Sequence, residues 1–270
     1  MAIINVTFPS SSLRRSVSFC AYLPSNRVDA SVDSPGNPYK ELKTLYMLHG
    51  YGGDCHDYLP MQELKDLSER YQLALIYPNG ENSFYLEGVD QSENFSTFVG
   101  KELVEVSRSM FRLSGKREDT FIGGFSMGGY GAMINGLRYA DTFSKIISLS
   151  GAYIEVNIAD KGEFIPDQVS DADYQRRIFK DPKQLRHSDR DPRYCMEALN
   201  RSNKKLPDIY LVCGESDFLI ESNRKLHTFM QENGIVHFYE EGEGAHDWTY
   251  LRKHIEPSVK WAIGEIESPE

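Results

Sequence analysis

The sequence predicts an α/β fold in which helices cover both faces of a mainly parallel central sheet. Short apolar runs of strand length alternate with helical stretches of ten to fifteen residues along most of the chain. The chain has 270 residues, of which 40% are hydrophobic, so it is long and apolar enough for one large core. We therefore expect residues 1–270 to form a single domain with a cap insertion at about 152–205.

The expected strands are short runs bounded by turn residues. The first two alternate apolar and polar residues, which favours an antiparallel pair, and the later ones are almost continuously apolar, which favours buried parallel strands. In chain order they are Ile3–Phe8, Val17–Leu23, Thr44–Leu48, Leu73–Tyr77, Thr120–Gly123, Ser144–Ser150, Asp208–Cys213 and Val236–Glu240. Residues 29–39 are rich in Pro, Gly, Ser and Asp and predict a loop.

The expected helices lie between these strands. In the first of them, Met61, Leu64 and Leu67 fall on one face at helical spacing. In chain order the helices are Pro60–Tyr71, Phe95–Phe111, Met127–Tyr139, Leu219–Asn233 and Trp248–Ile263. The segment Ala152–Lys205 interrupts the alternation because it is polar, charge-dense and irregular. Insertions at the carboxyl ends of parallel strands lie over the site, so we expect a cap there.

The charge excludes some classes of partner. The net charge is −10 and the pI is about 5.3, which argues against binding to nucleic acid or to an anionic membrane surface. No stretch approaches the ~20 apolar residues of a membrane span. The first eight residues alternate like a strand and do not resemble a signal peptide. We expect a cytoplasmic protein.

The four cysteines, Cys20, Cys55, Cys195 and Cys213, are scattered. They form no C-x-x-C pair and have no histidine at ligand spacing, so we expect reduced thiols and neither a disulfide framework nor a zinc site. We expect no metal and no cofactor.

A nucleophile motif follows the apolar run that ends at Gly123. Ser126 stands in Gly124-Phe125-Ser126-Met127-Gly128, between an expected strand and an expected helix. Such a turn exposes a serine hydroxyl at a helix N-terminus, and glycine is needed on both sides because neighbouring elements pack too close for a Cβ. The sequence therefore predicts a catalytic serine.

A serine needs a base and an acid, which in this fold follow it in the chain in the order acid, then histidine. Asp217 is the expected acid because it directly follows an apolar strand, and Glu215 is the rival two residues earlier. His246 is the expected base, because it lies after the last strand in a glycine-containing loop. For the oxyanion hole we expect the backbone N–H groups of Met127 and Tyr51.

The other downstream histidines fit this role less well. They are expected inside a strand, on helices or in the cap: His237, His227, His254 and His187.

The chain resembles the esterase D type of family, which includes tributyrin esterases, acetylesterases, small feruloyl esterases and S-formylglutathione hydrolases. Four stretches carry the resemblance: residues 48–53, 124–131, 213–219 and 244–248. The resemblance implies an α/β-hydrolase fold, no cofactor, hydrolysis of short-chain acyl esters, and a homodimer or homotetramer. It also assigns Ser126, Asp217 and His246 to the triad, and Tyr51 and Met127 to the oxyanion hole.

We therefore expect a serine carboxylesterase acting on acetyl or butyryl esters. The alternatives are a carbohydrate acetyl or feruloyl esterase, an S-formylglutathione hydrolase, and a non-catalytic small-molecule binding protein on the same fold. Tyr85, Tyr153 and Trp248 are the candidate substrate-binding side chains. For Tyr85 and Tyr153, packing in the core or cap is the alternative.

Overall fold

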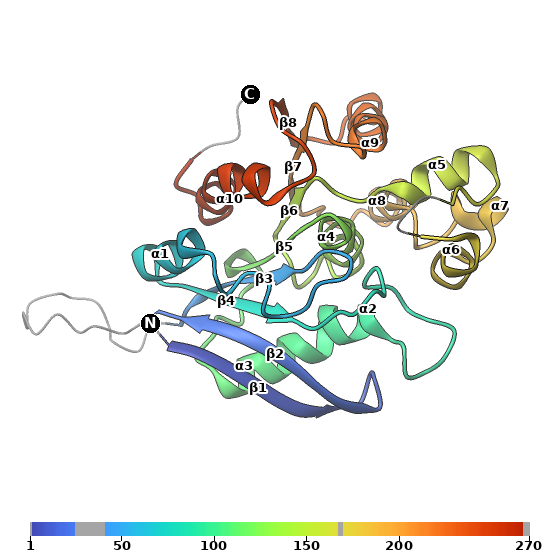
Figure 1. Cartoon of the computed structure of the whole chain (residues 1–270). Coiled ribbons are helices and arrows are strands. Elements are labelled where there is room, and N and C mark those ends of the chain that lie inside the picture. Colours follow the sequence, from blue (N-terminus) through green and yellow to red (C-terminus); the bar gives the residue numbers. More distant parts are fainter. Residues whose placement is uncertain (1, 25–40, 167–169, 267–270) are drawn as a thin grey trace, which may run out of the picture.

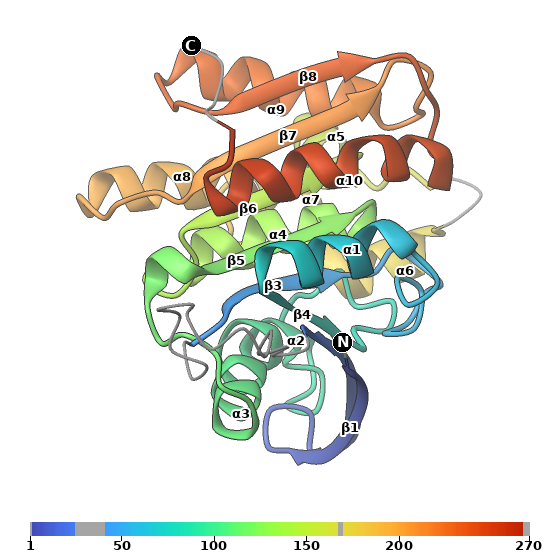
Figure 2. The same cartoon turned by 90° about the vertical axis from the view of Figure 1, so that its left-hand side faces the viewer.

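The centre of the molecule is an eight-stranded sheet with the spatial order β1-β2-β4-β3-β5-β6-β7-β8 (Figures 1 and 2). The structure, a computed structural model, describes residues 2–24, 41–166 and 170–266, so the loop expected at 29–39 lies outside the described residues. The strands are β1 Ala2–Ser10, β2 Arg15–Leu23, β3 Lys43–Leu48, β4 Leu73–Pro78, β5 Thr120–Phe125, β6 Lys145–Leu149, β7 Asp208–Gly214 and β8 Phe238–Gly242.

The sheet is antiparallel at one edge and parallel elsewhere. β1 pairs with β2, and β2 with β4, in antiparallel register, whereas the pairings from β4 through β3 and β5 to β8 are parallel. Every residue of β4 and β5 is buried, as their continuously apolar sequences require in a sheet covered on both faces. The predicted fold class is confirmed.

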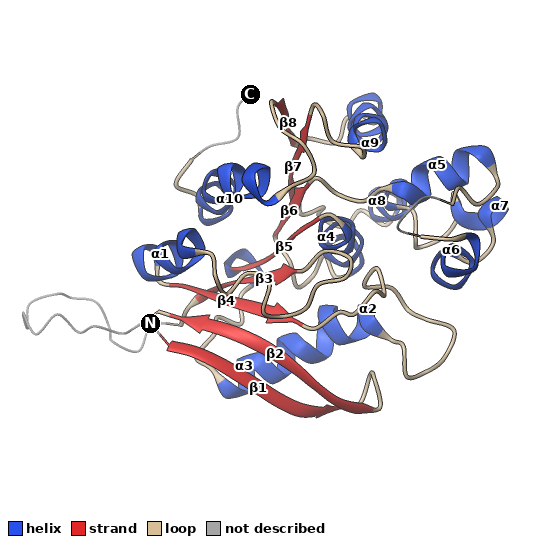
Figure 3. Cartoon of the chain, viewed as in Figure 1, coloured by secondary structure: helices blue, strands red, loops and turns tan. Residues whose placement is uncertain are grey.

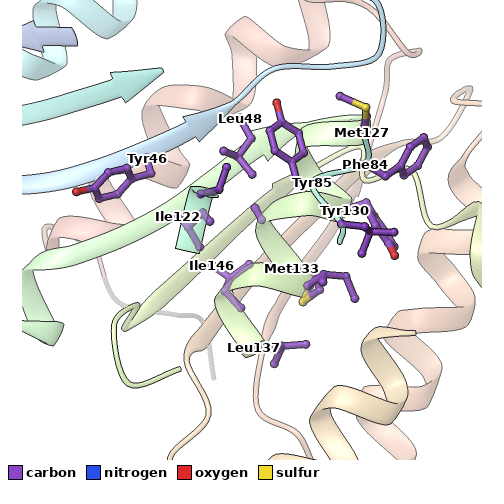
Figure 4. Close-up of a cluster of buried hydrophobic side chains, with 14 of the residues drawn as sticks. Tyr46, Leu48, Phe84, Tyr85, Ile122, Met127, Tyr130, Met133, Leu137 and Ile146 are labelled. Carbon is purple, nitrogen blue, oxygen red and sulfur yellow. The ribbon is translucent and has the colours of Figure 1, made fainter. Parts of the chain in front are cut away.

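Helices enclose a separate apolar core on each face of the sheet. α1 (Gln62–Tyr71) and α10 (Trp248–Ile263) cover one face, and Figure 2 shows them in front of the strands. α3 (Leu103–Met110), α4 (Met127–Arg138) and α9 (Ile220–Glu232) cover the other. In Figure 4, side chains of β3, β5 and β6 face those of α4 in this second core.

The helix expected at Phe95–Phe111 is present, but its middle is wider than an α-helix. α2 (Phe95–Thr97) and α3 flank a π-helical turn at Phe98–Glu102. The carboxylate of Glu102 accepts hydrogen bonds from Ser10 Oγ and from the N–H groups of Ser11 and Ser12. This helix therefore fixes the turn between β1 and β2.

The segment between β6 and β7 was expected to be irregular, and this expectation is wrong. It contains α5 (Ile154–Lys161), α6 (Ala172–Phe179), α7 (Pro182–Leu185) and α8 (Pro192–Arg201), which lie together to one side of the sheet in Figure 3. Three of these helices begin after an aspartate, Asp171, Asp181 or Asp191, whose carboxylate accepts a backbone N–H of the first turn. Pro182 and Pro192 occupy first helical positions, where no N–H is needed.

Among the described residues, no helix combines the length and the apolar character that crossing a membrane requires.

Candidate active site

Ser126 occupies a strained turn between β5 and α4. Its φ is +59° and its ψ is −122°, a conformation that L-residues rarely adopt. The turn brings backbones very close together, since a Cβ on Gly124 would lie 2.4 Å from the carbonyl carbon of Gly128. A Cβ on Gly128 would lie 2.0 Å from the carbonyl oxygen of Leu48. Both glycines of the motif are therefore required by sterics.

The three expected triad side chains meet at the carboxyl edge of the sheet. His246 Nε2 lies 2.9 Å from Ser126 Oγ, and His246 Nδ1 lies 2.8 Å from Asp217 Oδ2. Ser126 follows β5, Asp217 follows β7 and His246 follows β8. Carboxyl ends of parallel strands are where open α/β sheets place their sites.

Asp217 is suited to hold an imidazole in one orientation. It is buried, and its Oδ1 accepts the N–H of Leu219 at 2.8 Å. Burial opposes ionisation of the carboxyl, but the hydrogen bond and charge of His246 and the Leu219 N–H together keep the pKa of Asp217 below its usual value. An ionised Asp217 accepts a hydrogen bond from the Nδ1–H group of His246, which leaves the Nε2 lone pair facing Ser126. The side chain of the rival, Glu215, is exposed.

The His246 loop is packed on both sides. The imidazole stacks on Phe125 with ring centroids 4.6 Å apart, and Phe218 lies 4.7 Å away. Gly244 has φ +154°, and a Cβ there would lie 2.3 Å from the ring of Tyr250. The glycine before His246 thus allows a close approach to α10 that a side chain would block.

The expected oxyanion donors come from two segments beside Ser126. Met127 is the first residue of α4, where backbone N–H groups have no partner within the helix. Tyr51 follows Gly50, at which a Cβ would lie 3.6 Å from Ser126 Cβ. The loop that carries Tyr51 therefore runs directly alongside the serine.

That loop is anchored by polar contacts that sequence patterns did not reveal. His49 Nε2 accepts the N–H of Gly80 at 2.8 Å, and the Tyr85 hydroxyl donates to the His49 carbonyl at 3.0 Å. The side-chain oxygen of Asn82 accepts the Gly52 N–H at 2.7 Å. These partners lie about thirty residues apart in the chain, so no local motif links them.

Two of the three expected substrate-binding residues are core residues, and that prediction is wrong for them. Tyr85 and Tyr153 are fully buried (Figure 4 shows Tyr85 in the core above α4). The Tyr153 hydroxyl donates to Ser148 Oγ at 2.7 Å. Trp248 is 46% exposed and tilts against Phe125 with centroids 6.3 Å apart, so its role stays a prediction.

A small, mainly apolar cavity of about 40 Å³ opens beside Ser126. Its lining residues come from the turn after β3, the β4–α2 loop, the turn at Ser126, the start of α5, the residue position just before α6 and the start of α9. They are Tyr51, Phe84, Ser126, Met127, Ala152, Ile154, Ser170, Phe218 and Leu219. Sequence reasoning chose Tyr153, but the residues on either side of it face the cavity. The 152–205 segment therefore forms part of the wall, through Ala152, Ile154 and Ser170. The Tyr174 ring on α6 also packs edge-on against the Tyr51 ring, with centroids 5.5 Å apart.

Among the described residues, one group of side chains has the donors to hold a metal ion: Cys20, Cys55 and His56. They do not belong to the cavity beside Ser126.

Comparison with known proteins shows the family of this chain. Residues 10–262 match the family model described as "Putative esterase". An acetyl esterase of Caldicellulosiruptor saccharolyticus is 41% identical over 261 residues, which cover 97% of this chain and 98% of that protein.

Two solved structures from Staphylococcus aureus are also similar over nearly the whole chain. Fluorophosphonate-binding serine hydrolase F (FphF) superposes with a TM-score of 0.83 at 26% identity. An S-formylglutathione hydrolase (FrmB) superposes with a TM-score of 0.82 at 25% identity. Each match covers 97% of this chain and 98% of the other. The chain therefore belongs to the esterase family, has the α/β-hydrolase fold and is a carboxylic ester hydrolase.

Proposed function

We propose that this enzyme hydrolyses short-chain acyl esters, and acetyl esters above all, with Ser126 as nucleophile. The observation that carries the proposal is the hydrogen-bonded chain Ser126–His246–Asp217 beside a cavity of about 40 Å³. The full-length similarity to an acetyl esterase supports the choice of acyl group.

In the proposed reaction, Ser126 Oγ attacks the ester carbonyl carbon while His246 Nε2 takes its proton. Asp217 stabilises the imidazolium that forms. The bond between the carbonyl carbon and the alkoxide oxygen then breaks while His246 donates this proton to that oxygen. The alcohol leaves, and the acyl group remains bound to Ser126 Oγ as an acyl-enzyme. Water attacks the acyl-enzyme with His246 again acting as base, and the carboxylic acid departs.

The tetrahedral intermediate carries its charge on the former carbonyl oxygen. We assign the stabilisation of that oxygen to the backbone N–H groups of Met127 and Tyr51, the first at the positive end of the α4 dipole. Because the donors are backbone groups, their positions depend on the anchors of the loop, including Asn82 and Tyr85.

The size of the cavity supports a short acyl group. One water molecule needs roughly 10–15 Å³ of such space, so about 40 Å³ holds three or four non-hydrogen atoms. An acetyl group fits this volume, whereas an octanoyl chain extends beyond it. Phe84, Ile154 and Leu219 provide apolar walls for a methyl group.

The test is a series of initial rates on p-nitrophenyl acetate, butyrate, octanoate and palmitate, with methyl ferulate and S-formylglutathione alongside. We expect the highest kcat/KM on acetate or butyrate. Ser126→Ala should lower kcat by about 10⁶-fold and abolish labelling by a fluorophosphonate. Wild-type turnover in that variant would refute the nucleophile. A preference for ferulate or the glutathione thioester would be consistent with the proposed triad but would refute acetyl esters as the substrate class.

We also propose a cytoplasmic location, which the four free thiols support because such thiols persist in reducing compartments. The homodimer or homotetramer that the family resemblance implies stays a prediction, which light scattering after size-exclusion chromatography tests.

A further inference from the structure

The fold brings together two cysteines and a histidine away from the ester-hydrolysing site. Cys20 lies on β2, and Cys55 and His56 lie in the turn that follows the Tyr51 loop. Cys20 Sγ and Cys55 Sγ are 3.5 Å apart, and Cys55 Sγ is 3.6 Å from His56 Nδ1. One ligand atom from each of the three residues lies within 4.8 Å of the other two.

These separations match those between ligands that share one tetrahedral ion. Zinc lies about 2.3 Å from sulfur and about 2.05 Å from imidazole nitrogen. With those bond lengths, the Cys20–Cys55 and Cys55–His56 separations give angles at the ion of about 99° for S–Zn–S and about 112° for S–Zn–N, close to the tetrahedral value of about 109°. The two pairs that include Cys55 are therefore already spaced for one metal ion.

We propose that Cys20, Cys55 and His56 bind a soft divalent cation of the Zn²⁺ class, with water as the fourth ligand. Two thiolates and a neutral imidazole compensate the charge of such an ion. Binding releases the two thiol protons to solvent. The spacing in the sequence concealed this group because Cys20 and Cys55 are 35 residues apart.

The surroundings allow access and orient the imidazole. The two cysteines are buried, but the His56 side chain is 54% exposed, so an ion can reach the thiols from the histidine side. His56 Nδ1 now lies 3.0 Å from Asp54 Oδ1, and Nε2 lies 3.2 Å from the Asn5 side-chain amide. When Nδ1 binds the ion, the imidazole carries its proton on Nε2 instead. The Asn5 side-chain amide then turns so that its oxygen accepts a hydrogen bond from Nε2–H.

The experiment uses the full chain, reduced, stripped with a chelator and kept anaerobic. We expect titration with Co²⁺ to saturate at one ion per chain, with thiolate-to-cobalt charge-transfer absorption and the visible bands of tetrahedral cobalt. Zn²⁺ should displace the cobalt and bleach both signals. Cys20→Ser and Cys55→Ser should weaken binding at least ~100-fold, and His56→Asn at least ~10-fold. Cys195→Ser and His187→Asn are the matched controls and should bind as the wild type does.

Three results would overturn the site. They are substoichiometric cobalt without charge-transfer absorption, equal binding in the Cys55→Ser and Cys195→Ser variants, or a Cys20–Cys55 disulfide that persists after treatment with a reductant, seen as a mass lower by two hydrogen atoms. If a cysteine variant fails to fold, the cobalt affinities of the His56→Asn and His187→Asn variants decide, because His56 is exposed and its replacement leaves the core intact. Ester hydrolysis is measured in parallel. Because Ser126 is not a ligand of the proposed metal site, a failure of the metal proposal and a failure of the proposed function are seen in different measurements.

Discussion

Replacing Glu155 by glutamine should stabilise the enzyme, increasingly so as the pH rises. Glu155 lies in the first turn of α5 and is 0% exposed. Neither of its carboxylate oxygens has a hydrogen-bond partner among the described residues. Burial raises the pKa of Glu155 well above its usual value, with a further contribution from Asp191. The nearby Arg193 opposes this only in part, because its guanidinium already binds Asp191 and Asp160.

The magnitude follows from the proton that folding must take up. The ordinary glutamate pKa is 4.5, and burial raises the pKa of the folded-state group above it, so folding favours proton uptake at this position. Each pH unit above 4.5 therefore lowers the free energy of unfolding of the wild type by about 1.4 kcal/mol, until the pH reaches the folded-state pKa. Glutamine has nearly the same shape and no charge, so the Glu155→Gln variant avoids the penalty.

The assay is urea unfolding followed by circular dichroism at pH 5, 6, 7 and 8. The gain of Glu155→Gln over wild type should be small at pH 5 and should grow, by up to about 1.4 kcal/mol per pH unit, until the pH reaches the folded-state pKa. Asp160→Asn is the control of opposite sign. Although burial opposes ionisation there, hydrogen bonds from Lys225 and Arg193 lower the pKa of Asp160, so removing its charge should destabilise at neutral pH. A constant difference between Glu155→Gln and wild type across the series would refute the reasoning, because it would mean that Glu155 is ionised when buried.

Three further predictions concern the ester site. Asp217→Asn should lower kcat on p-nitrophenyl acetate about 10⁴-fold, because the imidazole of His246 is then misoriented. Replacement of the exposed Glu215 by glutamine should leave kcat within about threefold. The reverse ranking would assign the role of the acid to Glu215. Gly128→Ala places a methyl group 2.0 Å from a carbonyl oxygen, so we expect the free energy of unfolding in urea to fall by more than about 2 kcal/mol. Unchanged stability would show that the turn relaxes. Ile154→Ala enlarges the acyl cavity and should raise the butyrate-to-acetate ratio of kcat/KM about tenfold; an unchanged ratio would place the acyl group elsewhere.

The sequence was most informative where a local pattern determines the structure. The glycines around Ser126, the strand before Asp217 and the glycine before His246 each place a side chain at the end of a parallel strand. The structure brings these three side chains into one hydrogen-bonded chain, in the arrangement that the order of the motifs predicts.

The remaining features depend on contacts between distant segments. The sequence pattern around Tyr153 does not tell which of the residues 152, 153 and 154 face the cavity. The chain turns into α5 at this point, and the geometry of that turn decides which side chains face the cavity. No local sequence motif points to the Asn82–Gly52 contact or to the Cys20–Cys55 contact, because the two residues of each contact lie 30 and 35 positions apart in the chain. The short helices of the cap were missed because their residues are too polar for an apolar stripe to stand out, although their aspartate caps were visible.

Ser126 and His246 are separated by 120 positions in the chain. In the part of the chain that the structure describes, the turn at Ser126, the Tyr51 loop and six strands all lie before β7, yet the proposed base, His246, lies beyond β8. During synthesis the ribosome therefore completes the nucleophile turn long before the imidazole emerges. On the proposed mechanism, Ser126 therefore stays unactivated in the nascent chain until His246 has been synthesised and β8 has joined the sheet.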